Sequence, residues 1–196
     1  MTTDLLSAAC TDDSGRLGKP PASAPRQHLC ALFSGLGKAS APVTCNRYGD
    51  IMTIEEIKER PEGLIGCLLL IWESSVAATH DFLSNQDIIM LRPYVLEGLR
   101  KVPVLLVATE DDRPAAFLGM HDDMVDMLFV DASCRGRGLG GDLLYEALRR
   151  GAHRVDVNEQ NTQAVGFYIH AGFEVSGRSA TDALGLPFPV LHMKRS

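Results

Sequence analysis

A glycine-rich stretch constrains this sequence more than any other feature: Arg135-Gly136-Arg137-Gly138-Leu139-Gly140-Gly141. An apolar strand pattern at 124–130 precedes it, and a helical pattern follows it at 142–150. A glycine-rich connection from a strand to a helix lets backbone N–H groups approach an anion while the positive end of the helix points at it. Arg135 and Arg137 add positive charge where phosphate oxygens would lie. The stretch predicts a phosphate-binding loop, with a merely flexible turn as the alternative.

The residues around this loop restrict which phosphate it would bind. A Walker A loop ends in Gly-Lys-Ser/Thr, whereas Gly140 is followed by Gly141 and Asp142, which argues against ATP or GTP phosphoryl transfer. A dinucleotide-binding loop follows the first strand of a βαβ unit and has an acidic residue about 20 positions later. Asp156 lies near that distance, but the loop follows strands that should form an antiparallel meander. A ligand with a pyrophosphate and a different remainder is therefore favoured.

Residues 1–51 differ in composition from the remainder of the chain. They are rich in glycine, proline and small polar residues and show no sustained period of 2 or 3.6, apart from a brief apolar patch at 29–33. We expect a flexible N-terminal extension here and a folded domain over 52–196. An alternative is that translation naturally begins at Met52.

From residue 52 onward, strand and helix patterns alternate, which predicts an α/β domain. The expected strands are 52–57, 103–109, 115–120, 124–130, 153–157, 173–178 and 190–194, and the expected helices are 62–75, 84–99, 142–150 and 161–171. Ser84 and Asp87 form a capping-box pattern, Pro93 should kink its helix, and Gly172 is placed for a left-handed helix end. The apolar run Leu64–Trp72 is about half the ~20 residues that span a bilayer, so it predicts a buried helix.

Net charge, the N-terminal sequence and the cysteine pattern restrict the expected partners, location and cofactors. The formal net charge is −6 and no basic stripe is evident, which disfavours nucleic acid and anionic membranes as partners. The N-terminus lacks a signal-peptide pattern, so the expected location is cytoplasmic. The five cysteines lack metal-ligand spacing, which fits a reducing compartment and predicts no metal. A monomer or a homodimer is expected.

Two segments together resemble a known family. Arg135–Gly140 is similar to the Arg/Gln-x-x-Gly-x-Gly/Ala acetyl-CoA loop of the GNAT superfamily of N-acetyltransferases. Asn161-Thr162-Gln163-Ala164-Val165-Gly166-Phe167-Tyr168, followed by Ala171-Gly172-Phe173, resembles the family's Asn-x-x-Ala-x-x-Phe-Tyr…Gly-Phe segment. The resemblance covers about 52–196 and is greatest to the small bacterial YjaB-like acetyltransferases, in which 75–83 and 157–161 also have counterparts.

The resemblance implies a GNAT-type α/β fold: a mixed, mostly antiparallel sheet with splayed central strands, flanked by helices. Coenzyme A would occupy the gap between the splayed strands, with its pyrophosphate on the loop amides and its pantetheine along the strand that precedes the loop. Asn161 would contact the pantetheine arm, or serve only as a helix N-cap. The residues implied to bind acetyl-CoA are Leu128, Val130, Arg135, Gly136, Arg137, Gly138, Leu139, Gly140, Gly141 and Asn161.

The implied reaction moves an acetyl group from acetyl-CoA to a primary amine of a small molecule or protein, by direct attack in a ternary complex. An amine of pKa about 10.4 must lose a proton, and a thiol of pKa about 8.5 must leave. The resemblance assigns Tyr168 as the general acid that protonates the thiolate. A backbone N–H near Val130 would stabilise the oxyanion.

The sequence leaves open which residue is the general base that deprotonates the amine. Period-2 alternation puts Asp126 on the face of Met124, Leu128 and Val130, where it would act through water or merely bond loop backbone. His80 would contact the acceptor, act as base, or simply cap its loop with Asp81, and Glu73 is a third candidate. His121, His153 and His170 read as solvated surface residues. The acceptor should lie between the segments 74–84 and 179–189.

Two other function classes remain open at this point. One is a non-catalytic acyl-CoA sensor or interaction module that keeps only the donor site. The other is a nucleotide-binding enzyme, which would be stabilised by ATP or NAD and not by coenzyme A.

Overall fold

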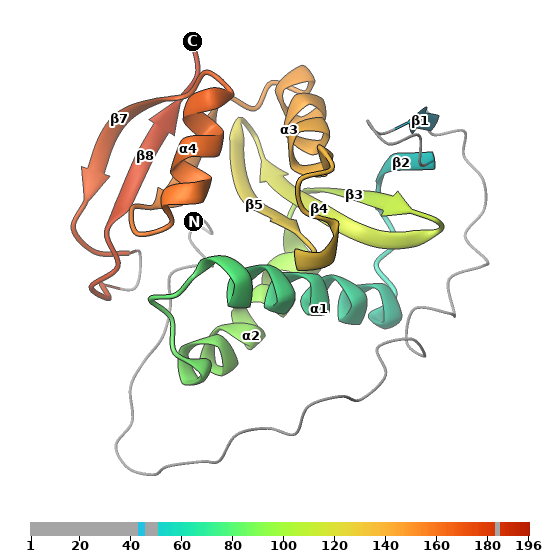
Figure 1. The fold of residues 1–196 in the computed structure, drawn as a ribbon, viewed down its shortest axis with the longest axis horizontal. Coiled ribbons are helices and arrows are strands. Elements are labelled where there is room, and N and C mark those ends of the chain that lie inside the picture. Colours follow the sequence, from blue (N-terminus) through green and yellow to red (C-terminus); the bar gives the residue numbers. More distant parts are fainter. Residues whose placement is uncertain (1–42, 46–50, 183–184) are drawn as a thin grey trace.

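The protein folds around one twisted sheet in a computed structural model that describes residues 43–45, 51–182 and 185–196 (Figure 1). The strands of this sheet lie in the order β1-β2-β3-β4-β5-β6-β8-β7. Their bounds are β1 Val43–Cys45, β2 Ile51–Glu56, β3 Val104–Glu110, β4 Arg113–His121, β5 Met124–Val130, β6 Arg154–Asn158, β7 Glu174–Ser179 and β8 Val190–Lys194. The helices are α1 Glu62–Thr79, α2 Asn85–Lys101, α3 Leu139–Arg149 and α4 Thr162–His170, with a short 3₁₀ turn, η2, at Ala132–Cys134.

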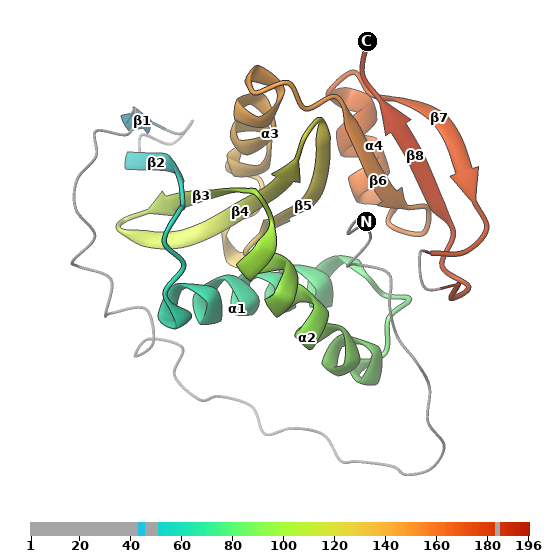
Figure 2. The ribbon, with the colours of Figure 1, turned by 180° about the vertical axis from the view of Figure 1, so that it is seen from behind.

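The sheet is mixed and mostly antiparallel, as expected. Every neighbouring pair is antiparallel except β5 and β6, which run parallel. These two strands pair only at Met124↔Arg154 and Val125↔Val155, near their N-terminal ends. Beyond those positions β5 continues along β4 and β6 continues along β8, so the sheet splits between them (Figures 1 and 2).

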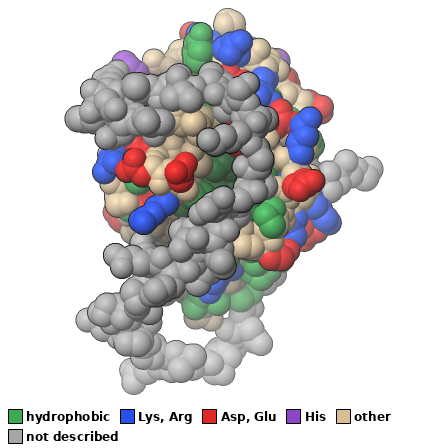
Figure 3. All heavy atoms as spheres, turned by 90° about the vertical axis from the view of Figure 1, so that its right-hand side faces the viewer, with side chains coloured by type: hydrophobic (Ala, Val, Ile, Leu, Met, Phe, Trp, Pro, Cys, Tyr) green, Lys and Arg blue, Asp and Glu red, His purple; other side chains and the backbone are tan. Residues whose placement is uncertain are grey.

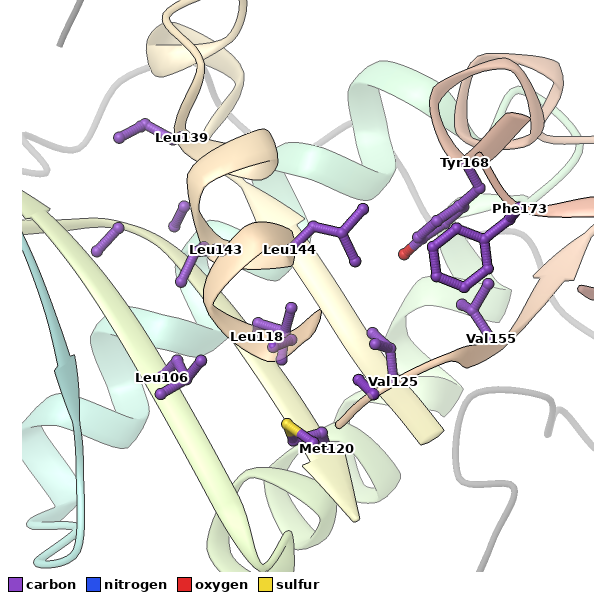
Figure 4. Close-up of a cluster of buried hydrophobic side chains, with 14 of the residues drawn as sticks. Leu106, Leu118, Met120, Val125, Leu139, Leu143, Leu144, Val155, Tyr168 and Phe173 are labelled. Atoms are coloured by element: carbon purple, nitrogen blue, oxygen red, sulfur yellow. The ribbon is translucent and has the colours of Figure 1, made fainter. Parts of the chain in front are cut away.

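Two hydrophobic cores hold the helices against opposite faces of the sheet. On one face, Leu143 and Leu144 of α3 pack with Val125, Tyr168 and Phe173 (Figure 4). On the other face, α1 and α2 bury a second cluster that contains Ile65, Leu68, Trp72, Leu99 and Phe117. The helical period of each amphipathic segment turns its apolar side chains toward the sheet, and each such side chain contributes about 1.5–3 kcal/mol of burial energy.

Helix α1 confirms the prediction of a buried apolar helix. Ile65 and Leu68 are fully buried, and Trp72 is nearly so. Among the described residues α1 alone is long and apolar enough to cross a membrane, and half of it is buried inside the protein. The helix is longer than expected, because Val76, Ala77 and Ala78 continue it to His80, whose N–H bonds the carbonyl of Val76.

Several local predictions are confirmed at the helix ends. The Ser84 N–H donates to the Asp87 carboxylate at 2.7 Å, and the Asp87 N–H donates to the Ser84 hydroxyl at 3.2 Å, which is the capping box. Gly172 has a φ of +88°. Helix α2 continues through Pro93, and the expected kink stays a prediction. Helix α3 begins earlier than expected, at Leu139, because the last glycines of the loop form its first turn.

The division into a flexible extension over 1–51 and a folded domain over 52–196 stays a prediction. Strand β1 lies inside the predicted extension and pairs with β2, so the sheet takes in residues that the composition did not mark as structured. Positions 1–42 and 46–50 lie outside the described residues, as do Cys10 and Cys30, and the start at Met52 stays a prediction. Cys67 and Cys134 are both free of disulfides.

Candidate active site

The split between β5 and β6 opens into a cleft of about 1790 Å³. This volume exceeds the ~300–1,000 Å³ of a typical single-ligand pocket, so there is room for two substrates. The cleft is lined by the glycine-rich loop, by β5, β6 and β8, by α4 and by the segment between α1 and α2. Of the residues that the sequence predicted for donor binding and catalysis, all but the third base candidate, Glu73, belong to this lining: His80, Asp126, Leu128, Val130, Arg135, Gly136, Arg137, Gly138, Leu139, Gly140, Gly141, Asn161 and Tyr168.

The loop places backbone amides at the N-terminus of α3. Gly136 and Gly138 have φ values of +77° and +96°, a region that L-residues enter at a cost of about 1–2 kcal/mol. Gly138 is the N-cap of α3, so the N–H groups of the first helical turn point out of the helix without intrahelical partners. The side chain of Leu139 is buried in the core and anchors the loop. This is the geometry of an anion site.

The side chains of the two loop arginines bond to different partners. Arg135 donates to the side-chain oxygen of Gln163 on α4. Arg137 forms an ion pair at 3.1 Å with Glu110, whose side chain is buried at the end of β3, and also donates to the Ser133 carbonyl at 3.3 Å. Arg137 therefore braces the loop against the sheet, and a phosphate would compete with Glu110 for its guanidinium.

Leu128 and Val130 lie on β5 beyond its last pairing with β6. One edge of this stretch pairs with Leu118 and Ala116 of β4. No strand of the described chain occupies the other edge. The backbone N–H and C=O groups of that edge are available to an extended ligand, which would add to β5 as a strand does.

A β-bulge at Asp126 corrects the predicted alternation. Gly119 pairs with Met127 while Met120 pairs with Val125, so β5 holds one residue more than β4 at this point. Val125 and Leu128 consequently pack against the same core, and strict period-2 alternation across Asp126 is wrong. The bulge lies at the level where β5 and β6 separate.

His121 is not a solvated surface residue, contrary to the prediction. It ends β4, lines the cleft and bonds Asp126, with 2.6 Å between His121 Nδ1 and Asp126 Oδ2. When the carboxylate accepts the Nδ1 proton, Nε2 keeps its lone pair. The pair therefore presents an oriented imidazole base beside the split.

Tyr168 lies on α4 among aromatic neighbours. Its ring meets those of Phe167 and Phe173 edge-on, at centroid distances of 5.1 and 5.5 Å. In Figure 4 the hydroxyl end of the ring is turned toward Leu144 of α3. Burial raises the pKa of Tyr168 above its ordinary value of 10.0, so the phenol stays protonated and is a donor at physiological pH.

His80 and Asn161, 81 residues apart, meet on the cleft wall. The Thr79 hydroxyl donates to the Ser75 carbonyl at 2.9 Å, so it accepts the Nδ1 proton of His80 at 2.7 Å. The His80 Nε2 lone pair then faces the Asn161 amide nitrogen at 3.4 Å. Asn161 also caps α4 by accepting from the Ala164 N–H at 3.1 Å, which confirms its predicted cap.

Burial lowers the pKa of His80 from 6.5 to about 4. A neutral imidazole with so low a pKa is a weak base for an alkylammonium group. Glu73 is no better as a base, because it forms an ion pair with Arg92 at 2.7 Å and is not part of the cleft lining. His121 is thus the histidine of the cleft best arranged to accept a proton.

A stability measurement checks the environment of His80. Between pH 6.5 and pH 4 the unfolded chain binds a proton on this ring that the folded chain does not. The contribution of His80 to the free energy of unfolding is therefore fully present above pH 6.5 and is lost as the pH falls toward 4. His80→Asn keeps a donor to Thr79 and removes the titration. The variant should lose less stability between pH 7 and pH 4.5, by on the order of 2 kcal/mol in urea unfolding. The exposed His170→Asn is the control, and an identical pH dependence in the His80 variant would contradict this environment.

The sequence missed a second histidine pair on the other side of the split. His192 of β8 bonds Asp156 of β6 through Nδ1 at 2.8 Å and the Ser179 hydroxyl of β7 through Nε2 at 2.8 Å. All three residues line the cleft. Only the strand register brings them together, and nothing in the local sequence signals it. Across the described residues, no three His, Cys, Asp or Glu side chains are grouped as a metal site.

A sheet that splits beside an amide-lined loop, with a histidine–aspartate pair at the split, is the arrangement that the GNAT resemblance implies. Residues 95–194 match the family model described as Acetyltransferase (GNAT) domain. The chain belongs to the GNAT family and is an N-acetyltransferase.

Named relatives and solved structures agree with this assignment. The peptidyl-lysine N-acetyltransferase YjaB of Salmonella typhimurium is 44% identical over 127 residues, covering 64% of this chain and 88% of the relative; that of Escherichia coli is 42% identical, covering 64% and 86%. The apo-form structure of Escherichia coli YjaB superimposes with a TM-score of 0.66 at 41% identity, covering 73% of this chain and 96% of that one. The PaiA N-acetyltransferase of Thermoplasma acidophilum, solved with coenzyme A, shares the fold, with a TM-score of 0.52 at 20% identity over 74% of this chain and 99% of that one.

Proposed function

We propose that this protein transfers the acetyl group of acetyl-CoA to the side-chain amine of a lysine in a protein, within a ternary complex. The observation that carries the proposal is the position of His121–Asp126 and Tyr168, which line the same cleft beside a strand edge and an amide-lined loop suited to coenzyme A. The acceptor class is that of the YjaB relatives, whose names specify peptidyl-lysine.

The donor site follows the length of the cleft. The coenzyme A pyrophosphate binds the amides of residues 136–141 at the N-terminus of α3. Pantetheine pairs with the open edge of β5 at Leu128 and Val130. The Asn161 amide contacts the pantetheine arm. Gln163 orients Arg135 beside the phosphates.

The groups at the split perform the transfer. His121 Nε2 accepts a proton from the lysine ammonium, and Asp126 stabilises the imidazolium that results. The neutral amine attacks the thioester carbonyl, and a backbone N–H on the open edge of β5 stabilises the oxyanion. The C–S bond then breaks, and the thiolate takes the proton of the Tyr168 hydroxyl. The new amide nitrogen loses its extra proton, which returns to Tyr168 through solvent, and His121 releases its own proton to solvent. The products are an acetylated lysine and free coenzyme A.

Binding and catalysis are measured separately to test this function. Acetyl-CoA should raise the melting temperature, and ATP or NAD should not. A thiol-release assay with lysine peptides, polyamines, amino acids and aminoglycosides then reports turnover, and we expect the lysine peptides to react fastest. Stabilisation by acetyl-CoA without thiol release from any amine would instead indicate the acyl-CoA sensor.

The glycine loop gives a sharp test of the donor site. Gly138→Ala places a Cβ at a φ of +96°, which costs about 1–2 kcal/mol, and the loop relaxes away from its amide-exposing shape. We expect the dissociation constant of acetyl-CoA, measured by calorimetry, to rise about tenfold. Gly66→Ala, in α1 with open space around the added Cβ, is the control and should bind as the wild type does. Equal affinity in both variants would place the pyrophosphate elsewhere.

We infer a single catalytic domain over 52–196, acting in the bacterial cytoplasm as a monomer or homodimer, without a metal, nucleic acid or membrane partner. Where Figure 3 leaves the described residues in view, acidic and basic side chains are interspersed on that face.

A further inference from the structure

The hydrogen-bonded chain Asp156–His192–Ser179 has no part in the acetyl-transfer steps above. Asp156 follows Val155, the last residue of β6 to pair with β5, so it stands where the cleft begins. His192 lies directly opposite Asp156 in the β6–β8 register. Because Asp156 accepts the Nδ1 proton of His192, the His192 Nε2 accepts the hydroxyl proton of Ser179. One imidazole tautomer satisfies both bonds.

The strand register determines which way these side chains face. Val155, Val157 and Met193, which flank Asp156 and His192, are buried in the core beneath α3 and α4. Since side chains alternate along a strand, Asp156 and His192 project from the opposite face of the sheet. That face is the side of α1 and α2, and the segment joining these helices forms the cleft wall there.

One carboxylate oxygen of Asp156 can accept a further hydrogen bond. Its Oδ1 accepts from His192, and no side chain of the described residues bonds its Oδ2. The Lys and Arg side chains of the cleft lining are already bonded elsewhere: Lys101 to Glu97, Arg135 to Gln163 and Arg137 to Glu110. A half-buried carboxylate is favourable only with a partner. A cation arriving with the acceptor would supply it.

The adjoining wall suits an alkyl chain. Phe82, from the segment between α1 and α2, lies 5.9 Å from Phe188 and 5.2 Å from His80 between ring centroids. All three rings line the cleft. A cleft that offers both apolar ring faces and a carboxylate matches a group with a hydrocarbon stem and a cationic head.

We infer that Asp156 is a specificity-determining residue that binds the acceptor's ammonium group before the proton is removed, with His192 and Ser179 as positioning residues. The inference rests on the proposed lysine acceptor and adds how that acceptor is selected. Across the split, Asp156 holds the head group while His121 takes its proton.

A binding experiment tests this role without turnover. Two peptides that differ only in lysine or norleucine are titrated into the protein in the presence of coenzyme A, which holds the donor site without supplying an acetyl group. The wild type should bind the lysine peptide about thirtyfold more tightly, a ratio typical of one charge-assisted hydrogen bond in a half-buried site. In Asp156→Asn the ratio should fall to about threefold, with coenzyme A affinity unchanged.

Matched variants separate this role from general damage. Asp123→Asn removes another carboxylate that bonds a histidine and an arginine, His153 and Arg154, outside the cleft lining, and should keep the wild-type ratio. Ser179→Ala should lower the ratio only about two- to threefold and leave turnover measurable.

Three results would overturn the inference: equal affinity of the wild type for both peptides, an unchanged ratio in Asp156→Asn, or loss of all turnover in Ser179→Ala, which would make Ser179 a nucleophile of the hydrolase type. If the wild type acetylates lysine peptides while the ratio is unaffected by Asp156, only this inference fails. If it acetylates no amine, the proposed function fails.

Discussion

Replacing His121 by glutamine should lower kcat for acetyl transfer to a lysine peptide about a hundredfold or more, because general-base catalysis contributes roughly 10²–10⁴. Glutamine can still donate a hydrogen bond to Asp126, but it cannot take a proton from the ammonium group. The affinity for acetyl-CoA should be unchanged, since His121 lies at the split and not at the loop. Steady-state kinetics with both substrates saturating measures the loss.

The control for this variant is His153→Gln. His153 also bonds an aspartate, Asp123, at 3.1 Å, but it is exposed and outside the cleft lining. Its kcat should match that of the wild type. A His121→Gln enzyme within threefold of the wild type would assign the base to another residue, and His80 would be the next to replace.

Removing the Tyr168 hydroxyl should lower turnover at least tenfold. Phenylalanine keeps the edge-on contacts to Phe167 and Phe173, so the core and the affinity for acetyl-CoA should be preserved. The loss arises because the thiolate departs without a proton donor. Tyr145→Phe, on the exposed face of α3, is the matched control and should be fully active.

The role of Tyr168 in the departure of the thiol can be separated from a positioning effect. An acetyl thioester whose thiol has a lower pKa needs less protonation to leave. With that donor the deficit of Tyr168→Phe should shrink, whereas a displaced donor would give the same deficit with both thioesters. An identical deficit would remove the general-acid role.

Local sequence signals predicted much of the fold and the glycine-rich loop to which the proposal assigns the donor. The glycine cluster, the Ser84–Asp87 capping box, the Asn161 cap and Gly172 each depend on residues a few positions apart, and the structure has all of them in place. The meander and the final strand pair followed from period-2 patterns bounded by turns. Such features are encoded within single segments.

The histidine–aspartate pairs of the cleft were harder to predict, because they depend on the register between strands. Asp126 reaches His121 only because β5 has one residue more than β4 at this point. The sequence of residues 124–130 contains no signal that predicts this bulge. Asp156, His192 and Ser179 come from three strands and meet through the β6–β8–β7 pairing. Single-sequence periodicity gives the face of each residue but not its neighbour on the next strand.

The central claim is tested most directly by counting products in one reaction. Acetyl-CoA and a lysine peptide are incubated with the wild type, and free thiol and acetylated lysine are quantified together by thiol titration and mass spectrometry. The account predicts one acetylated lysine for each thiol released, and almost none of either with a His121→Gln, Tyr168→Phe double variant that still binds acetyl-CoA. Thiol release without acetylated lysine, or equal turnover by the double variant, would contradict it.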